Sequence, residues 1–147
     1  MNDTYIIDTT SLISYFHNIF EVHCAISQGS IDIIEKGFNG ELKLIIPSIV
    51  FVEIFYKWYL TQEMIEKIRR EVFFNITEHE KIHICPIEIE ILQNVALITG
   101  IKSDIKFDNH DKQVLATAMM YKCPLITSDK KIARFVKKYN VIPEILN

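Results

Sequence analysis

The chain alternates short apolar runs with longer segments whose apolar residues recur every three or four positions. The short runs are rich in β-branched residues and predict buried strands, whereas the longer segments predict helices. The predicted strands are residues 5–7, 41–46, 82–87, 125–127 and 141–142. Strands that alternate with helices indicate a parallel sheet covered by helices. We therefore expect an α/β fold with a central parallel sheet of four or five short strands, flanked by helices.

Turn and capping residues divide the predicted helices from one another. The helical periods cover residues 9–16, one or two helices within 17–38, and then 49–60, 61–70, 88–98, about 110–121 and 130–139. Ser48 follows a proline and is expected to cap the helix after it, and Thr61 is expected to cap the next one. Gly100 is expected to end the helix of residues 88–98.

Length and composition suit one packed domain, which we take as residues 1–147. Half of the residues are hydrophobic, and glycine and proline number only four each, which argues against disorder. The longest apolar run, residues 45–60, is interrupted by Glu53 and Lys57 and is too short for a membrane span of ~20 residues. The N-terminus lacks a basic, apolar signal sequence. We therefore expect a cytoplasmic protein with no membrane segment and, from three scattered cysteines, reduced thiols.

Charge is unevenly distributed along the chain. Sixteen basic and nineteen acidic residues give a net charge of −3, which excludes the overall basicity of a non-specific nucleic-acid binder. Five of the sixteen basic residues nevertheless fall within nine positions, namely Lys130, Lys131, Arg134, Lys137 and Lys138. A local basic patch directly after Asp129 is therefore expected.

Four acids follow the predicted strands or begin the predicted helices. Asp8 ends the first strand, and Glu53 lies in the first turns after the second. Asp111 begins a helix, and Asp129 lies two residues beyond the strand of residues 125–127. Ligands of open α/β sheets bind beyond the carboxyl ends of the strands. The four acids are therefore predicted to meet at one edge of the sheet.

Helix capping is the simpler explanation for the acids of the C-terminal half. Carboxylates near helix N-termini are favoured by capping and by the helix dipole, worth ~0.5 to 2 kcal/mol each. Asp108 fits an N-cap with Asp111 three residues on, and Asp129 fits the N-cap of the basic helix. Taken singly, these acids favour capping over ligand binding.

Glu53 is harder to explain as a structural residue, because apolar neighbours on its helix predict burial. An unpaired buried carboxylate costs several kcal/mol, so Glu53 needs a partner. Lys57 could pair with it at helical spacing. The alternative is a divalent cation, and carboxylate ligands without His or Cys suit Mg²⁺ or Mn²⁺.

Three stretches resemble the ordered signatures of PIN-domain ribonucleases, including stand-alone toxins of the VapC type. They are YIIDTTSLISYF, IPSIVFVEIFY and HDKQVLATAMMYKCPLITSDKKI, and the resemblance spans residues 5 to about 142. It implies a PIN-like three-layer α/β/α fold. The acids of the family fall on Asp8, Glu53, Asp111 and Asp129, which are expected to bind Mg²⁺ or Mn²⁺, and its helper hydroxyls fall on Thr9 and Thr127.

The resemblance also implies an activity and partners. The expected activity is metal-dependent hydrolysis of RNA phosphodiester bonds, with Lys130, Lys131 and Arg134 binding the RNA. If the chain is a toxin, a small antitoxin is expected to bind the apolar surface around Phe55, Trp58 and Tyr59, where a homodimer contact is also expected.

Some features depart from the family pattern or permit other functions. Asp104 and Asp108 could share or replace the role of Asp111, and Ser128 stands where similar chains often carry a basic residue. A catalytically silent interaction module is one alternative. A phosphoryl-transfer enzyme with Asp8 as nucleophile is another, although the chain lacks a second acid two residues later. The HExxH match of residues 79–83 is discounted as a zinc site, because a predicted strand begins inside it.

Overall fold

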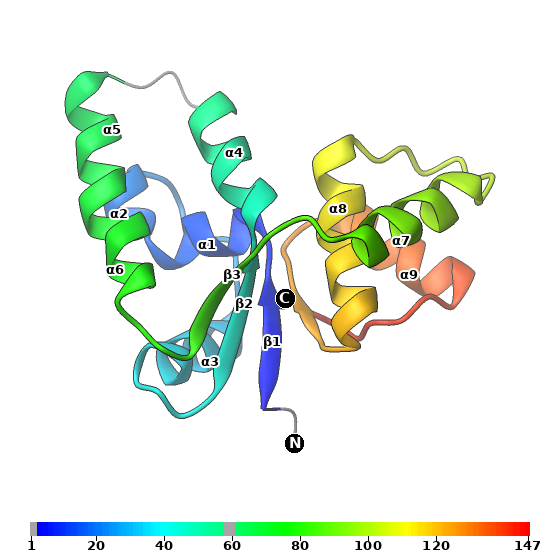
Figure 1. Ribbon diagram of the computed structural model, residues 1–147, viewed down its shortest axis with the longest axis horizontal. Helices are drawn as coiled ribbons and strands as arrows, with labels where there is room; N and C mark the ends of the chain where they lie inside the picture. The colour runs from blue at the N-terminus through cyan, green and yellow to red at the C-terminus, as the bar shows by residue number, and fades with distance from the viewer. Residues whose placement is uncertain (1–2, 58–60) are drawn as a thin grey trace.

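A five-stranded parallel sheet forms the centre of the protein, seen nearly edge-on in Figure 1. The computed structural model describes residues 3–57 and 61–147. The strand order is β3-β2-β1-β4-β5, and every neighbouring pair is parallel. The strands are β1 (Thr4–Ile7), β2 (Lys43–Pro47), β3 (Ile82–Cys85), β4 (Leu125–Ile126) and β5 (Ile145–Leu146). The predicted α/β fold with a parallel central sheet is therefore confirmed.

The last strand lies later in the chain than predicted. The prediction of residues 141–142 is wrong, because the Val141 N–H donates to the Val136 carbonyl and closes the preceding helix. Pro143 follows and has no N–H to donate to a strand. Pairing with β4 is made instead by β5, where the Leu125 N–H donates to the Glu144 carbonyl at 2.9 Å.

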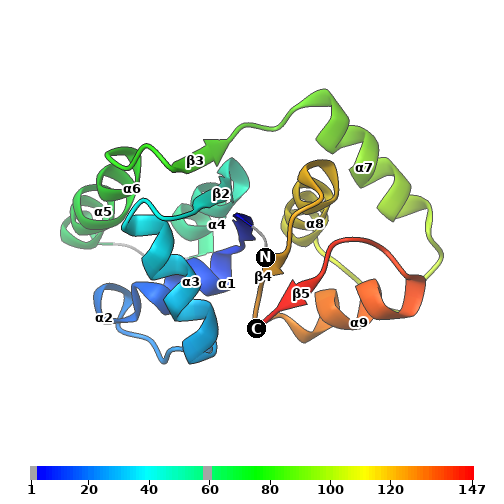
Figure 2. The ribbon, with the colours of Figure 1, turned by 90° about the horizontal axis from the view of Figure 1, so that it is seen from below.

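Helices connect consecutive strands and lie on opposite sides of β1, as Figures 1 and 2 show. On one side are α1 (Thr9–Tyr15), α2 (His17–Phe20), α3 (Gln28–Phe38), α5 (Gln62–Ile68), the π-helical turn η1 (Arg69–Phe74) and α6 (Asn75–Thr77). On the other side are α7 (Ile89–Gly100), α8 (Asn109–Tyr121) and α9 (Lys130–Tyr139). The remaining helix, α4 (Ser48–Lys57), continues directly from β2.

Helix boundaries follow the predicted caps in part. The Thr61 hydroxyl accepts from the Met64 N–H at 3.1 Å and caps α5 as predicted, but the helical stretch continues to Thr77 rather than ending near residue 70. Ser48 is the first residue of α4 rather than its cap, because β2 extends through Pro47. Gly100 is the last residue of α7.

The core is built on the three inner strands. Their apolar side chains are at most 1% exposed at Ile6, Ile7, Leu44, Ile45, Ile46, Leu125 and Ile126. On α8, Ala116 and Ala118 are fully buried, and such small side chains let a helix approach its neighbours closely. Strands buried on both faces carry continuous apolar runs, which is why they were recognisable in the sequence. Within residues 3–57 and 61–147, no helix is long and apolar enough to cross a membrane.

Close approach of α3 to the sheet depends on Gly37. A Cβ added there would lie 2.2 Å from Leu44 Cδ1 and 2.4 Å from Leu44 Cγ. Leu44 is fully buried in β2 and is enclosed by its neighbours. We therefore expect Gly37→Ala to lower the free energy of unfolding by about 1–3 kcal/mol, the usual cost of overpacking a core. Urea denaturation followed by circular dichroism measures this change.

Gly29 provides the control, because it belongs to the same helix. A Cβ there would meet only Ser27 Oγ, at 3.8 Å. Gly29→Ala is therefore expected to keep or raise stability, by up to about 1 kcal/mol from helix propensity. Equal effects of the two substitutions would contradict the proposed contact with Leu44.

Candidate functional site

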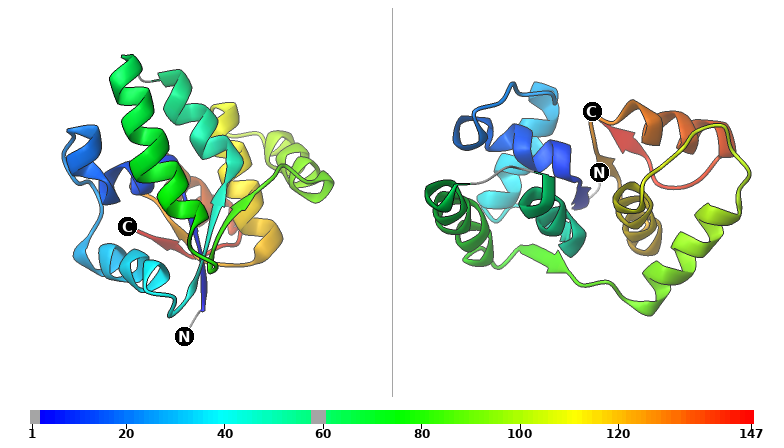
Figure 3. Two further views of the ribbon diagram at one scale, coloured as in Figure 1. Left: turned by 60° about the vertical axis from the view of Figure 1, so that its left-hand side comes forward. Right: turned by 90° about the horizontal axis from the view of Figure 1, so that it is seen from above.

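The four acids singled out in the sequence lie on elements that meet at the carboxyl edge of the sheet. Asp8 follows β1 directly, and Glu53 lies on α4, which follows β2. Asp111 is in the first turn of α8, and Asp129 is the N-cap of α9, after β4. Figure 3 (right) looks onto this edge, where α1 (blue), α4 (teal) and α8 (dark yellow) are grouped around the middle of the molecule.

Asp8 is buried and held by hydrogen bonds from two parts of the chain. Its side chain caps α1, with Oδ1 accepting from the Ser11 N–H at 2.9 Å and from the Thr10 hydroxyl at 3.0 Å. The Thr127 hydroxyl donates to Oδ2 from the end of β4. Burial raises the pKa of Asp8, and these hydrogen bonds offset part of that rise. The carboxylate is therefore fixed in position before any ligand binds.

The Thr10 hydroxyl of α1 donates to Asp8 Oδ1. The resemblance had pointed to Thr9, which is buried beside Asp8. Thr10 also accepts a hydrogen bond from Ser128 Oγ at 3.0 Å, which joins α1 to the loop after β4. Thr10 was missed in the sequence, although its place two residues after a helix-capping acid was a usable signal.

Asp129 is linked to Asp8 through one hydroxyl. The Asp129 N–H donates to Thr127 Oγ1 at 3.0 Å, and the same Thr127 hydroxyl donates to Asp8. The Asp129 carboxylate accepts from the Lys131 N–H at 2.8 Å and so caps α9, as the capping alternative predicted. Capping occupies one oxygen of Asp129 and leaves its negative charge at the site.

Asp111 lies among the charges of the other acids. Its pKa is raised to about 7, first by burial and then by the negative charges of Asp108, Asp129 and Glu53. Asp111 therefore lies within range of the charges of Asp108, Asp129 and Glu53. Close carboxylates in a partly buried setting repel one another, so a cation or a proton is needed there.

Glu53 is only 8% exposed and lies beside His110. His110 Nδ1 is 3.7 Å from Glu53 Oε2 and 3.9 Å from Asp108 Oδ1. The sequence suggested Lys57 as the partner of Glu53, but the side chain of Lys57 lies outside the described part of the structure. The sequence alone gives no sign of this contact, because His110 and Glu53 lie on different helices.

The two additional acids take different places. The Asp108 side chain caps α8, with Oδ1 accepting from the Asp111 N–H at 2.9 Å. Asp104 forms an ion pair with Lys138, whose Nζ lies 2.9 Å from its Oδ1, and its side chain is 78% exposed. Asp108 therefore borders the acid cluster, whereas Asp104 is engaged with the far end of α9.

The oxygen donors at this edge are of the kind that a hard divalent cation prefers, although they lie apart from one another in this structure. The available donors are carboxylate and hydroxyl oxygens, which Mg²⁺ and Mn²⁺ prefer. Within the described residues, no three His, Cys, Asp or Glu side chains are grouped closely enough to hold a metal ion. Repulsion among the acids is consistent with this separation.

The HExxH sequence does not form a zinc site. His83 lies in β3, whereas His79 precedes the strand and its Nε2 is hydrogen-bonded to Asn75 Oδ1 at 3.1 Å. The motif requires both histidines on one face of a continuous helix. The two histidines therefore lack the arrangement that the zinc motif requires.

Comparisons with known proteins place this geometry in a wider context. A family model described as a PIN domain matches residues 5–138. A comparison with curated proteins gives no match. The fold is shared with FitAcB from Neisseria gonorrhoeae, with a TM-score of 0.67, 11% identity, and 97% of this chain and 96% of that chain covered.

Two further solved structures share the fold. VapBC2 from Rickettsia felis, solved bound to a DNA fragment from its promoter, has a TM-score of 0.61 at 15% identity and covers 98% of this chain and 97% of that one. A toxin-antitoxin complex from Klebsiella pneumoniae has a TM-score of 0.57 at 16% identity and covers 97% and 96%. At such low identities these likenesses show the fold alone.

The raised pKa of Asp111 predicts how the stability of the metal-free protein depends on pH. The folded state keeps a proton, with a pKa of about 7, that the unfolded state releases near 3.8. The free energy of unfolding therefore falls as pH rises through this range. We expect Asp111→Asn to stabilise the protein at about pH 8 relative to about pH 5, by on the order of 1 kcal/mol after allowance for solvent screening. Urea denaturation in EDTA at both pH values measures it.

Asp32 is a suitable control for this titration. It lies on α3 and accepts a hydrogen bond from Gln28 Nε2 at 2.9 Å on the exposed surface. Asp32→Asn should keep the pH dependence of the native protein. If Asp111→Asn also keeps it, the electrostatic coupling among the acids is refuted.

Proposed function

The chain belongs to the PIN domain family, and we propose that it is a metal-dependent endoribonuclease that hydrolyses RNA phosphodiester bonds. The proposed catalytic residues are Asp8, Glu53, Asp111 and Asp129. The observation that carries the proposal is the position of these acids at one edge of the sheet. The Thr127 hydroxyl joins Asp8 to Asp129, and His110, the residue before Asp111, lies beside Glu53. A purely structural set of caps would not need to share one region of negative charge.

The four carboxylates are the proposed ligands of Mg²⁺ or Mn²⁺. A bound divalent cation lowers the pKa of water, stabilises the leaving oxygen and neutralises the phosphate charge. Asp8 would enter the complex already oriented, because Thr10, Ser11 and Thr127 hold its two oxygens. Such preorganisation limits the reorganisation needed during the reaction.

Residues around the acids suit the handling of substrate. Lys130, Lys131 and Arg134 are exposed on the helix that starts at Asp129, and they are proposed to bind RNA phosphates. His110 lies between Glu53 and Asp108. It is placed to hold the orientation of the Glu53 carboxylate when metal binds.

A catalytically inactive PIN-like module that binds RNA or protein is the alternative. The observation in its favour is that Asp8, Asp108 and Asp129 all cap helices, which gives each of them a structural role. Cleavage of RNA by the purified protein decides between the two functions.

Asp8→Asn is expected to abolish RNA cleavage while the fold stays intact. Asparagine keeps the shape of the side chain and an oxygen for the Ser11 N–H, but it removes the negative charge that a metal ligand needs. We expect cleavage to fall by about a hundredfold or more, the scale of losing a group that stabilises the transition state. Cleavage of RNA in Mn²⁺, with circular dichroism of both proteins, measures this effect.

Asp32→Asn again serves as the matched control, since it removes an exposed acid that is hydrogen-bonded to Gln28 within α3. It should leave the cleavage rate unchanged. Full RNA cleavage by purified Asp8→Asn protein would contradict the proposed mechanism. Absence of cleavage by the native protein in Mn²⁺ and Mg²⁺ would favour the inactive module.

A small antitoxin is the proposed protein partner. Two of the structures with this fold are described as a VapBC complex and a toxin-antitoxin complex. On this chain, α4 exposes Val52, Phe55 and Tyr56, which are 56%, 41% and 82% exposed. An apolar helix face of this kind suits a partner helix or strand. Trp58 and Tyr59, also expected at this surface, lie outside the described residues, and the homodimer remains a prediction.

Val52→Glu should disrupt antitoxin binding without disturbing the core, because the side chain is largely exposed. A charge in the centre of an apolar interface typically costs 2 kcal/mol or more, roughly a thirtyfold loss of affinity. Co-purification with the product of the adjacent reading frame, followed by calorimetry, measures it. Leu92→Glu on α7, where the side chain is 54% exposed, is the control and should bind normally. Equal binding by both variants would place the partner elsewhere.

A further inference from the structure

The geometry points to a groove between α9 and the loop of residues 101–108 as the path of a single-stranded RNA leading away from the acid cluster. This inference rests on the proposed function and names the surface along which the RNA would bind. The groove has a volume of about 440 Å³ and is lined by Asp104, Ile105, Arg134, Lys137 and Lys138. Lys137 and Lys138 extend the set of proposed RNA contacts beyond the first turns of α9.

Both walls of the groove start at the acid cluster. One wall is α9, which begins at its cap Asp129, and the other is the loop, which ends at Asp108, the cap of α8. The loop runs along α9, because Phe107 packs on Phe135 with ring centroids 4.7 Å apart. Further along, Lys138 Nζ is 2.9 Å from Asp104 Oδ1. An RNA strand bound in the groove would therefore lead directly to the acid cluster.

The basic residues of α9 occupy one face of the helix. Lys130, Lys131, Arg134, Lys137 and Lys138 are all exposed. At 3.6 residues per turn they fall within an arc of about 120° and extend about 12 Å along the axis. Ile132 and Phe135 occupy the opposite, buried side. A continuous cationic face of this length matches the repeating charge of a phosphate backbone.

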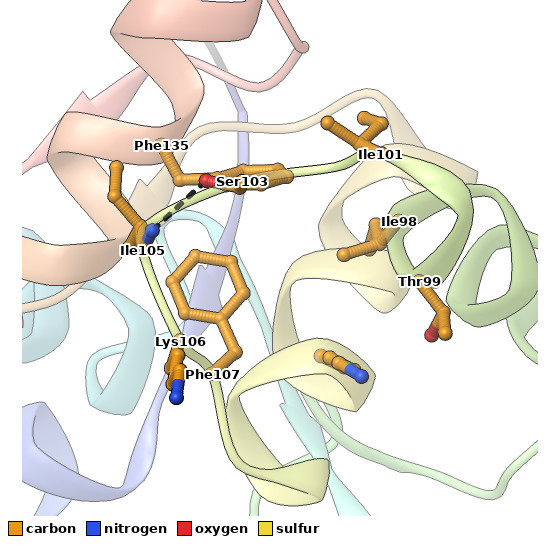
Figure 4. A pocket seen from close by; sticks show the side chains of 9 residues that line it. Ile98, Thr99, Ile101, Ser103, Ile105, Lys106, Phe107 and Phe135 are labelled. Carbon is orange, nitrogen blue, oxygen red and sulfur yellow. Dashed lines mark hydrogen bonds between the residues drawn. The ribbon is translucent and has the colours of Figure 1, made fainter.

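The loop contributes an aromatic side chain and further positive charge. Figure 4 shows Lys106 and Phe107 on the loop, with Phe107 beside Phe135 at a second hollow of about 240 Å³. Lys112, which follows Asp111 on α8, also lines this hollow. Proteins that bind single strands combine cationic grooves with aromatic side chains on which bases stack. The two hollows share Ile105 and so adjoin each other.

The concentration of positive charge here contrasts with the net charge of the whole chain, which is −3. Asp104 is the acid among the groove residues, and its pairing with Lys138 neutralises part of the positive charge. Phosphate binding would compete with this exposed pair, which contributes little to stability. Removing the Asp104 charge should therefore strengthen RNA binding.

The test is the affinity for a fluorescently labelled, mixed-sequence single-stranded RNA of about twelve nucleotides. Anisotropy in EDTA measures binding without metal-dependent cleavage. In about 0.1 M salt, the double substitution Arg134→Ala/Lys137→Ala should raise the Kd for the RNA on the order of tenfold. The slope of log Kd against the logarithm of the salt concentration should fall by about 1.4, because each lost phosphate contact lowers it by about 0.7. Asp104→Asn should lower Kd.

A double variant with the same change of charge controls for the net charge of the protein. Lys36 and Lys81 are exposed near the starts of β2 and β3, at the opposite edge of the sheet, and Lys36→Ala/Lys81→Ala should bind RNA as the native protein does. Equal Kd values for the two double variants would contradict the proposal that RNA binds in the groove. The groove variant could lose RNA binding while the native protein shows no cleavage. That result would support RNA binding in the groove and reject the nuclease proposal, so failure of one proposal can be told from failure of the other.

Discussion

The buried carboxylate of Asp8 is the constraint on which the rest of the site depends. A charged group removed from water costs several kcal/mol unless it is hydrogen-bonded. Here the compensation comes from α1, through Thr10 and Ser11, and from the end of β4, through Thr127. The Ser11 hydroxyl also donates to the Ile126 carbonyl at 2.8 Å. The hydrogen bonds of Asp8 and Ser11 thus fix the position of α1 against β4, which lies more than a hundred residues later in the chain.

Capping and ligand binding are compatible roles for these acids. An N-cap engages one carboxylate oxygen with a backbone N–H, and this anchors the side chain at the edge where ligands of α/β sheets bind. Asp8 and Asp129 are both held in this way and are joined by the Thr127 hydroxyl. Asp111 is not a cap, and its pKa is raised first by burial and then by the neighbouring negative charges.

Features encoded locally were predictable from the sequence. The start and end of α9, the capping by Asp108 and Asp129, and the position of Asp8 after β1 follow from residue types over a few positions. Features that depend on distant parts of the chain were not. The approach of His110 to Glu53 requires α8 to lie beside α4. The true last strand was obscured because residues 141–142 have strand-like composition, while hydrogen bonding to β4 selects residues 145–146.

The order of the acids along the chain has a consequence for biosynthesis. Domains form from the N-terminus as the chain is made. Asp8, however, receives a hydrogen bond from Thr127. In addition, β4 pairs with its outer neighbour only after β5 has been added. A nascent chain that carries Asp8 and Glu53 alone has half of the acids and lacks the hydrogen bond from Thr127 to Asp8. The edge of the sheet that carries the acids is therefore complete only once residues 125–147 have been added.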